Sequence, residues 1–158
     1  MAIPRISRES SLHMRKYCGS ANLLRAARVV TRHYDRELRD AAGITATQLP
    51  LLAAINAGAN ASIRSLADDL DLERSTVSRE LAGLKRLGLI TTSAGTDKRA
   101  TVLALTPRGH KTLSAAYDAW QRAHAAITEE YGRDELDALL AETRQLAKAV
   151  KSLIHRDK

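Results

Sequence analysis

The chain has 158 residues, a length that favours one domain, alone or with a dimerising extension. Hydrophobic residues make up 44% and charged residues 27%, which argues against wholesale disorder. Aromatic residues make up only 3%, with no Phe, so a helical protein is favoured over a β-sandwich. The single cysteine excludes an internal disulfide framework, and the net charge of +7 suits a polyanionic partner.

The basic residues are unevenly distributed. The first 43 residues contain nine basic and four acidic residues, and residues 74–99 contain six and two. Residues 64–73 contain one basic and four acidic residues. The moderate total charge therefore hides a basic face, as phosphate contacts require. We expect no signal peptide and no membrane span, and hence a cytoplasmic protein.

Residues 1–13 are predicted to be an irregular arm, followed by one helix over about residues 15–39. The apolar stripe of this helix consists of Leu23, Ala27, Val30, Tyr34 and Leu38. Thr45 and Gln48 have capping-box spacing and open a helix that ends near residue 57, with Pro50 in its first turn.

Two short helices are predicted next, near residues 63–70 and 74–87, joined by a tight turn. Ser62 caps the first helix, and Gly88 takes the left-handed position after the second. The buried stripe of the second helix is Val77, Leu81 and Leu84. Residues 89–93 and 100–105 are predicted to form a hairpin, because a polar, glycine-containing loop separates them.

Two long helices complete the chain. Thr106 and Pro107 form a strong helix start, and Gly132 separates this helix from the last one. The first has a stripe that we expect in the core or a dimer interface: Leu113, Tyr117, Trp120, His124, Ile127 and Tyr131. The last has the stripe Leu136, Leu139, Leu140, Leu146, Val150 and Leu153.

This order of elements describes a mainly α fold with a small β-hairpin wing, in which a winged helix-turn-helix domain lies between long terminal helices. Its second short helix is suited to the major groove of DNA. The side chains left outside near its N-terminus are Arg74, Ser75, Thr76, Ser78 and Arg79. The wing tip carries Asp97, Lys98 and Arg99, and an extended Arg99 suits a minor groove. Glu73 precedes this helix, where glutamate is a weak N-cap. Arg74 can therefore pair with the Glu73 carboxylate instead of contacting DNA.

The sequence resembles the MarR family of bacterial transcriptional regulators. The resemblance rests on Thr45-Ala-Thr-Gln48-Leu-Pro-Leu-Leu52, Leu66-Ala-Asp-Asp-Leu70, Ser75-Thr-Val-Ser-Arg79, Leu84-Lys-Arg-Leu-Gly-Leu-Ile90, Asp97-Lys-Arg-Ala100 and Leu105-Thr-Pro-Arg-Gly109. It implies a homodimer that binds a pseudo-palindromic double-stranded operator as a repressor, with Asp97 orienting the wing. The implied parts are an N-terminal arm and dimerisation helix (1–44), a DNA-binding domain (45–105) and C-terminal dimerisation helices (106–158).

The resemblance also implies release from DNA by a small aromatic effector or by an oxidant. Cys18, beside Arg15 and Lys16, is the redox candidate, although a packed, unreactive thiol is the commoner role for such a residue. The candidates for an effector pocket are His13, Tyr17, Arg25 and Arg28. We expect no metal site, cofactor or catalytic residues, because no such motif is present. The alternative function is a winged-helix module that binds protein or nonspecific nucleic acid.

Overall fold

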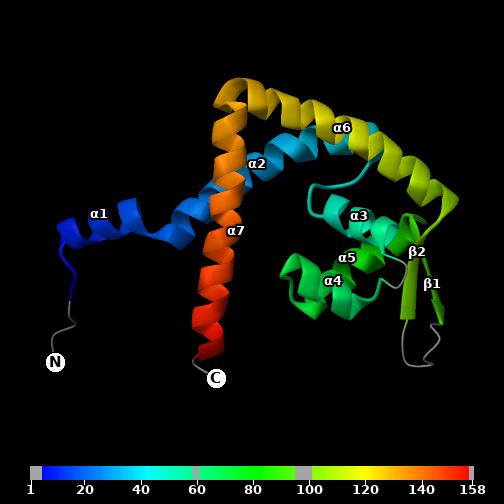
Figure 1. Cartoon of the computed structure of the whole chain (residues 1–158), viewed down its shortest axis with the longest axis horizontal. Coiled ribbons are helices and arrows are strands. Elements are labelled where there is room, and N and C mark those ends of the chain that lie inside the picture. Colours follow the sequence, from blue (N-terminus) through cyan, green and yellow to red (C-terminus); the bar gives the residue numbers. More distant parts are fainter. Residues whose placement is uncertain (1–4, 59–60, 95–100, 157–158) are drawn as a thin grey trace.

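In the computed structural model, which describes residues 5–58, 61–94 and 101–156, long helices flank a small helical domain with one antiparallel hairpin (Figure 1). The predicted fold class is confirmed. The elements are α1 (Arg8–Tyr17), α2 (Gly19–Ala42), α3 (Leu49–Ala57), α4 (Ile63–Leu70), α5 (Arg74–Arg86), β1 (Ile90–Ala94), β2 (Thr101–Leu105), α6 (Pro107–Tyr131) and α7 (Arg133–Arg156).

The N-terminal prediction is wrong in two respects. Residues 8–13 belong to a helix, α1, because Ser7 caps it by accepting a 3.0 Å hydrogen bond from the Ser10 amide. A single helix over residues 15–39 is also wrong, because Cys18 is extended and separates α1 from α2. The Asn22 amide stabilises this break by donating to the Lys16 and Cys18 carbonyls at 3.2 and 2.9 Å.

The helices α2 and α6 lie side by side along much of their length (Figure 1). The buried side chains of α6 are Ala116, Ala119 and Ala123, whose small size lets the helix axes approach closely. The aromatic stripe predicted for this helix lies elsewhere, since Tyr117 is 54% exposed and Trp120 is half-buried. These aromatic residues therefore lie outside the core of the single chain, because the rotation of α6 is set by its close contact with α2, and their place in a dimer interface stays a prediction.

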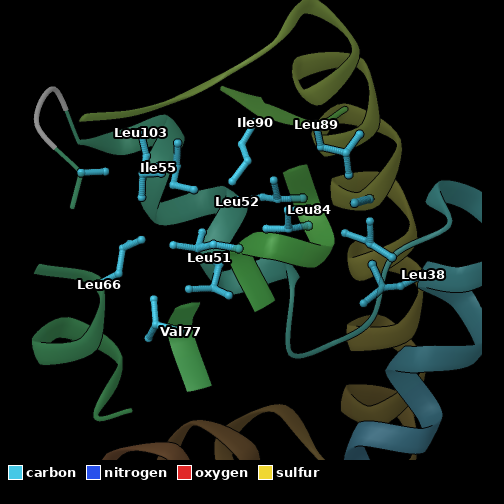
Figure 2. Packing of buried hydrophobic residues seen from close by; sticks show 14 of the residues in the cluster. Leu38, Leu51, Leu52, Ile55, Leu66, Val77, Leu84, Leu89, Ile90 and Leu103 are labelled. Carbon is cyan, nitrogen blue, oxygen red and sulfur yellow. The ribbon is translucent and has the colours of Figure 1, made fainter. Parts of the chain in front are cut away.

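A leucine-rich core joins the short helices to the hairpin. Figure 2 shows side chains from α3, α4, α5 and both strands converging on one region. Its largest fully buried members are Leu38, Ile44, Leu51, Leu52, Leu66, Val77 and Leu84. The hairpin pairs Ile90 with Leu105 at its base, and the Leu103 amide donates to the Ala61 carbonyl at 2.9 Å. The wing is thereby tied to the segment that precedes α4.

The predicted starts of α4 and α6 and the predicted end of α5 are confirmed, whereas the helix predicted to open at Thr45 begins at Leu49, because residues 46–48 form a turn. Ser62 and Ser65 form a reciprocal capping box, and Thr106 caps α6 by accepting from the Gly109 amide at 3.0 Å. Gly88 has a φ of +69°, the left-handed conformation that a helix C-terminus requires.

Candidate DNA-binding surface

The helices α4 and α5 are joined by a turn of three residues. Asp71 ends α4 with a φ of +54°, a left-handed conformation that Asp tolerates better than most residues do. Glu73 is the N-cap of α5 and makes no side-chain capping hydrogen bond. The Thr76 amide donates to the Glu73 carbonyl at 2.9 Å, whereas the amides of Arg74 and Ser75 have no partner among the described residues, and the positive end of the helix dipole lies at this turn.

Residues of α5 divide between the core and the surface as predicted. Val77, Leu81 and Leu84 are buried, and this burial fixes which side of the helix faces outward. The outward side carries the exposed residues Arg74, Ser75, Ser78 and Arg79, whereas Thr76 is half-buried. Neither Arg74 nor Arg79 forms an ion pair with any residue that the structure describes, so the alternative pairing of Arg74 with Glu73 is not observed. This surface combines hydroxyl and guanidinium groups on a positive helix end.

The hairpin that carries the wing is held against the end of α5. The Lys85 ammonium lies 3.4 Å from the Thr92 hydroxyl, which links the last turn of α5 to β1. The wing-tip candidates Asp97, Lys98 and Arg99 lie outside the residues that the structure describes.

The sequence-predicted effector residues are spread over two helices. His13 and Tyr17 lie on α1 with their ring centroids 4.7 Å apart, and the Cys18 thiol is exposed at the break after them. Arg25 and Arg28 are exposed on α2. None of the five lines either of two well-formed cavities in the described part of the chain.

The more polar of these cavities lies between α3 and α6. It has a volume of about 680 Å³ and is lined by Leu49, Pro50, Ala53, Asn56, His110, Leu113, Ser114, Tyr117 and Trp120. The Trp120 ring stacks between those of Tyr117 and His124, at centroid distances of 5.8 and 5.1 Å. Sequence reasoning missed this cavity, because the spacing of Tyr117 and Trp120 also fits a helix face buried in a core. The signal was present in the histidine, serine and aromatic residues that share one side of α6.

Among the described residues, no group of three or more His, Cys, Asp or Glu side chains is placed to hold a metal ion. None of the described helices is long and apolar enough to cross a membrane.

The helix pair, the tight turn and the hairpin define a winged helix-turn-helix protein. Residues 42–100 match the model of the MarR family. The structure is similar to M. tuberculosis transcriptional regulator MosR in complex with DNA, with a TM-score of 0.73 and 33% sequence identity over 84% of this chain and 98% of that chain. A search of curated proteins found no match.

A second similar protein is the transcriptional repressor CouR. Its complex with a 23-mer DNA duplex has a TM-score of 0.74 and 25% identity, over 92% of this chain and 99% of that one. Its complex with p-coumaroyl-CoA has a TM-score of 0.73 and 25% identity, over 82% and 91%. The chain described here belongs to the MarR family of transcriptional regulators.

Proposed function

We propose that this chain is a homodimeric repressor that binds a pseudo-palindromic double-stranded operator in the cytoplasm and is released by an effector. Residues 45–105 form the DNA-binding domain, and residues 1–44 and 106–158 provide the dimerisation helices. The observation that carries the proposal is the exposed N-terminal half of α5, where Arg74, Ser75, Ser78 and Arg79 face outward from a positive helix end. The complexes of MosR and CouR with DNA support it.

The chemistry of this surface suits both phosphates and base edges. An α-helix fits the major groove, where a guanidinium donates two hydrogen bonds to guanine O6 and N7. Serine hydroxyls and free backbone amides suit phosphate oxygens. Arg79, one turn into α5, is the residue to which we assign base reading, with Ser75, Thr76 and Ser78 beside it. Arg74, Lys98 and Arg99 add contacts to the backbone or the minor groove, with Asp97 orienting the wing.

The proposal is tested by fluorescence anisotropy with a duplex selected by the wild-type protein from random sequence, compared with a scrambled duplex across a salt series. We expect specific binding at least about 10³-fold tighter than nonspecific binding. Arg79→Ala should cost about 1–3 kcal/mol at the selected site. The control is Arg36→Ala, an equal loss of charge at a side chain on α2 that is 70% exposed. Equal binding to both duplexes would contradict specific regulation and favour a nonspecific basic protein.

The surface of the single chain supports the dimer. Its accessible area is 12121 Å², whereas a compact monomer of this mass exposes about 7,800 Å². The excess of about 4,300 Å² is larger than one subunit's share of an ordinary obligate interface, in which the two partners together bury about 2,000–5,000 Å². Apolar residues on α2 and α7 are more than two-fifths exposed and flank one groove, lined in part by Leu23, Leu24, Leu146 and Val150. We assign this groove to the partner subunit.

A charge in the groove tests the dimer. Leu146→Glu should shift the sedimentation mass from dimer to monomer, because an unpaired carboxylate would be buried in an apolar interface. The control is Gln145→Glu, which adds the same charge at the neighbouring residue, because Gln145 does not line the groove. An unchanged dimer in Leu146→Glu would place the interface elsewhere.

We further propose that the cavity between α3 and α6 binds a small aromatic effector that carries a hydroxyl or carboxylate. Its volume falls in the range of small-molecule sites. Leu49, Pro50 and Leu113 offer an apolar wall, whereas His110 and Ser114 offer hydrogen bonds. The site lies between a helix of the DNA-binding domain and a dimerisation helix. An occupant that favours one arrangement of these two helices therefore changes DNA affinity.

The chain offers its own probe for this site, since Trp120 is its only tryptophan. Titration with 4-hydroxybenzoate should change its fluorescence and weaken operator binding. By linkage, DNA should weaken 4-hydroxybenzoate binding by the same factor. Ala53→Leu fills the cavity from an exposed position and should abolish both effects, whereas Ala125→Leu, exposed on α6, should abolish neither. Equal responses in both variants would place the site elsewhere.

A further inference from the structure

The turn between α2 and α3, residues 45–48, is held by reciprocal hydrogen bonds between its first and last residues. The Gln48 side-chain carbonyl accepts from the Thr45 amide at 3.1 Å, and the Thr45 hydroxyl accepts from the Gln48 amide at 3.3 Å. These two bonds are the reciprocal pair of a capping box. They fix the Gln48 side chain in one orientation, because its oxygen is committed to the turn.

The nitrogen of the same amide reaches the DNA-binding helix. Gln48 Nε2 donates to Glu80 Oε2 on α5 at 3.4 Å, across 32 positions of sequence. Glu80 is half-buried and directly follows Arg79, to which we assign base reading. Gly83 lies one turn further along α5, and a Cβ there would make only an ordinary contact of 3.6 Å with the Gln48 amide nitrogen.

The opposite side of the turn is tied to α2. Asp35 Oδ1 accepts a 2.7 Å hydrogen bond from the Ala46 amide, and its other oxygen pairs with Arg39 at 3.2 Å. The side chain of Asp35 is only 23% exposed. One carboxylate of the dimerisation helix therefore holds the backbone of the turn, and one amide of the turn holds α5.

We propose that the 45–48 turn is a joint that sets the position of α5 relative to α2, with Gln48 and Asp35 as positioning residues for DNA binding. The inference rests on the proposed function and explains how α5 is held in the position that DNA binding requires. Apolar burial of Val77, Leu81 and Leu84 holds α5 against the core, but such contacts have little directionality. A hydrogen bond has preferred distances and angles, so the Gln48–Glu80 bond restricts sliding and rotation of the helix. Because Asp35 lies on the dimerisation helix α2, the same joint fixes the relative placement of the two copies of α5 in a dimer.

The first test exchanges the two partners. Gln48→Glu places a second carboxylate beside Glu80 and should weaken binding to the selected duplex by roughly five- to tenfold, while nonspecific binding changes much less. The double variant Gln48→Glu/Glu80→Gln keeps the wild-type charge and restores one donor and one acceptor, so it should regain wild-type specificity. Gln145→Glu, on α7, controls for added charge alone. Unchanged specificity in Gln48→Glu, or no recovery in the double variant, would overturn the proposal.

The second test uses Asp35. Asp35→Asn retains an oxygen that can accept from the Ala46 amide, whereas Asp35→Ala does not. We expect specific binding to fall severalfold in Asp35→Ala and to stay near wild type in Asp35→Asn. Equal binding by these two variants would remove Asp35 from the joint.

A readout without DNA separates this proposal from the proposed function. Hydrogen exchange should accelerate in residues 74–86 of Gln48→Glu, stay unchanged in residues 133–156, and recover in the double variant. If Gln48→Glu does not fold, Gln48→Ala removes the bond without adding charge and should show the same pattern. If the wild-type protein binds no duplex specifically while Gln48→Glu shows this exchange pattern, the proposed function is overturned and the joint stands. If hydrogen exchange in Gln48→Glu rises equally in α5 and α7, or rises in neither helix, the proposed joint is refuted.

Discussion

Replacing Gly109 by alanine should destabilise the protein, whereas the same change at Gly83 should stabilise it. Gly109 lies in the first turn of α6, where Thr106 donates from its amide to the Leu89 carbonyl at 3.0 Å and from its hydroxyl to the Gly88 carbonyl at 2.7 Å. These bonds draw α6 onto the start of β1. A Cβ at Gly109 would lie 2.0 Å from the Leu89 carbonyl oxygen and 3.0 Å from its carbon. Both atoms belong to backbone, so the two elements would have to separate.

The magnitudes follow from these distances. Alanine gains at most about 1 kcal/mol over glycine inside a helix. Overpacking of a filled site costs about 1–3 kcal/mol, and each strained Thr106 hydrogen bond adds about 0.5–1.5 kcal/mol. With both Thr106 bonds strained and the helix-propensity gain subtracted, Gly109→Ala should lower the free energy of unfolding by about 1–5 kcal/mol. At Gly83 the nearest atom to a new Cβ lies 3.6 Å away, which is an ordinary contact. Gly83→Ala should therefore raise the free energy of unfolding by about 0.5–1 kcal/mol.

Urea-induced unfolding followed by circular dichroism measures both values. The protein concentration must be the same throughout, because the stability of a dimer depends on it. Equal stability changes of one sign in the two variants would refute the reasoning, since helix propensity alone would then explain both. The result also bears on the Leu105-Thr-Pro-Arg-Gly109 stretch, in which threonine and glycine together allow the close approach of α6 to β1.

Three further predictions concern single side chains. Burial raises the pKa of the Tyr34 hydroxyl, so the stabilisation from its neutral form is present below about pH 10 and is lost as the pH rises further. The Tyr34 hydroxyl lies 3.1 Å from His124 Nδ1, so Tyr34→Phe should cost about 0.5–1.5 kcal/mol at neutral pH. This difference should shrink in urea titrations above pH 10, and a constant difference would contradict the assignment. Cys18→Ser should keep operator affinity but abolish release by peroxide in anisotropy assays, whereas an equal peroxide response in both proteins would discard the redox route. Arg99→Ala should weaken operator binding and reduce its salt slope by about one phosphate contact, and an unchanged slope would remove Arg99 from the interface.

Local signals in the sequence predict most element boundaries correctly. Ser62, Gly88 and Thr106 act within three or four residues of chain, so their capping roles can be inferred without knowledge of the tertiary structure. The same holds for α5, whose apolar residues at helical spacing are the ones buried. Helix α1 has a comparable local signal in Ser7 and Ser10. Its apolar content is too low for hydrophobic periodicity to predict a helix there.

Rotation of a helix about its axis is less well determined by sequence. On α6 both the alanine side and the aromatic side have helical periodicity, and hydrophobicity favours the aromatic side. The structure buries Ala116, Ala119 and Ala123, because small residues permit the close approach of α2. Tyr117 and Trp120 are thereby left to line a cavity. A preference of this kind depends on the partner helix, which no local pattern specifies.

The sequence alone determined the winged helix-turn-helix order, the outward side of α5 and the likeness to one family, because these depend on short-range capping, periodicity and motif spacing. Only the tertiary structure decided which side chains meet across the fold. Gln48 reaches Glu80 over 32 positions, and Tyr34 reaches His124 over 90, since both contacts require several helices to pack in one arrangement. Such contacts result from the packing of the whole chain, and spacing along the sequence does not encode them.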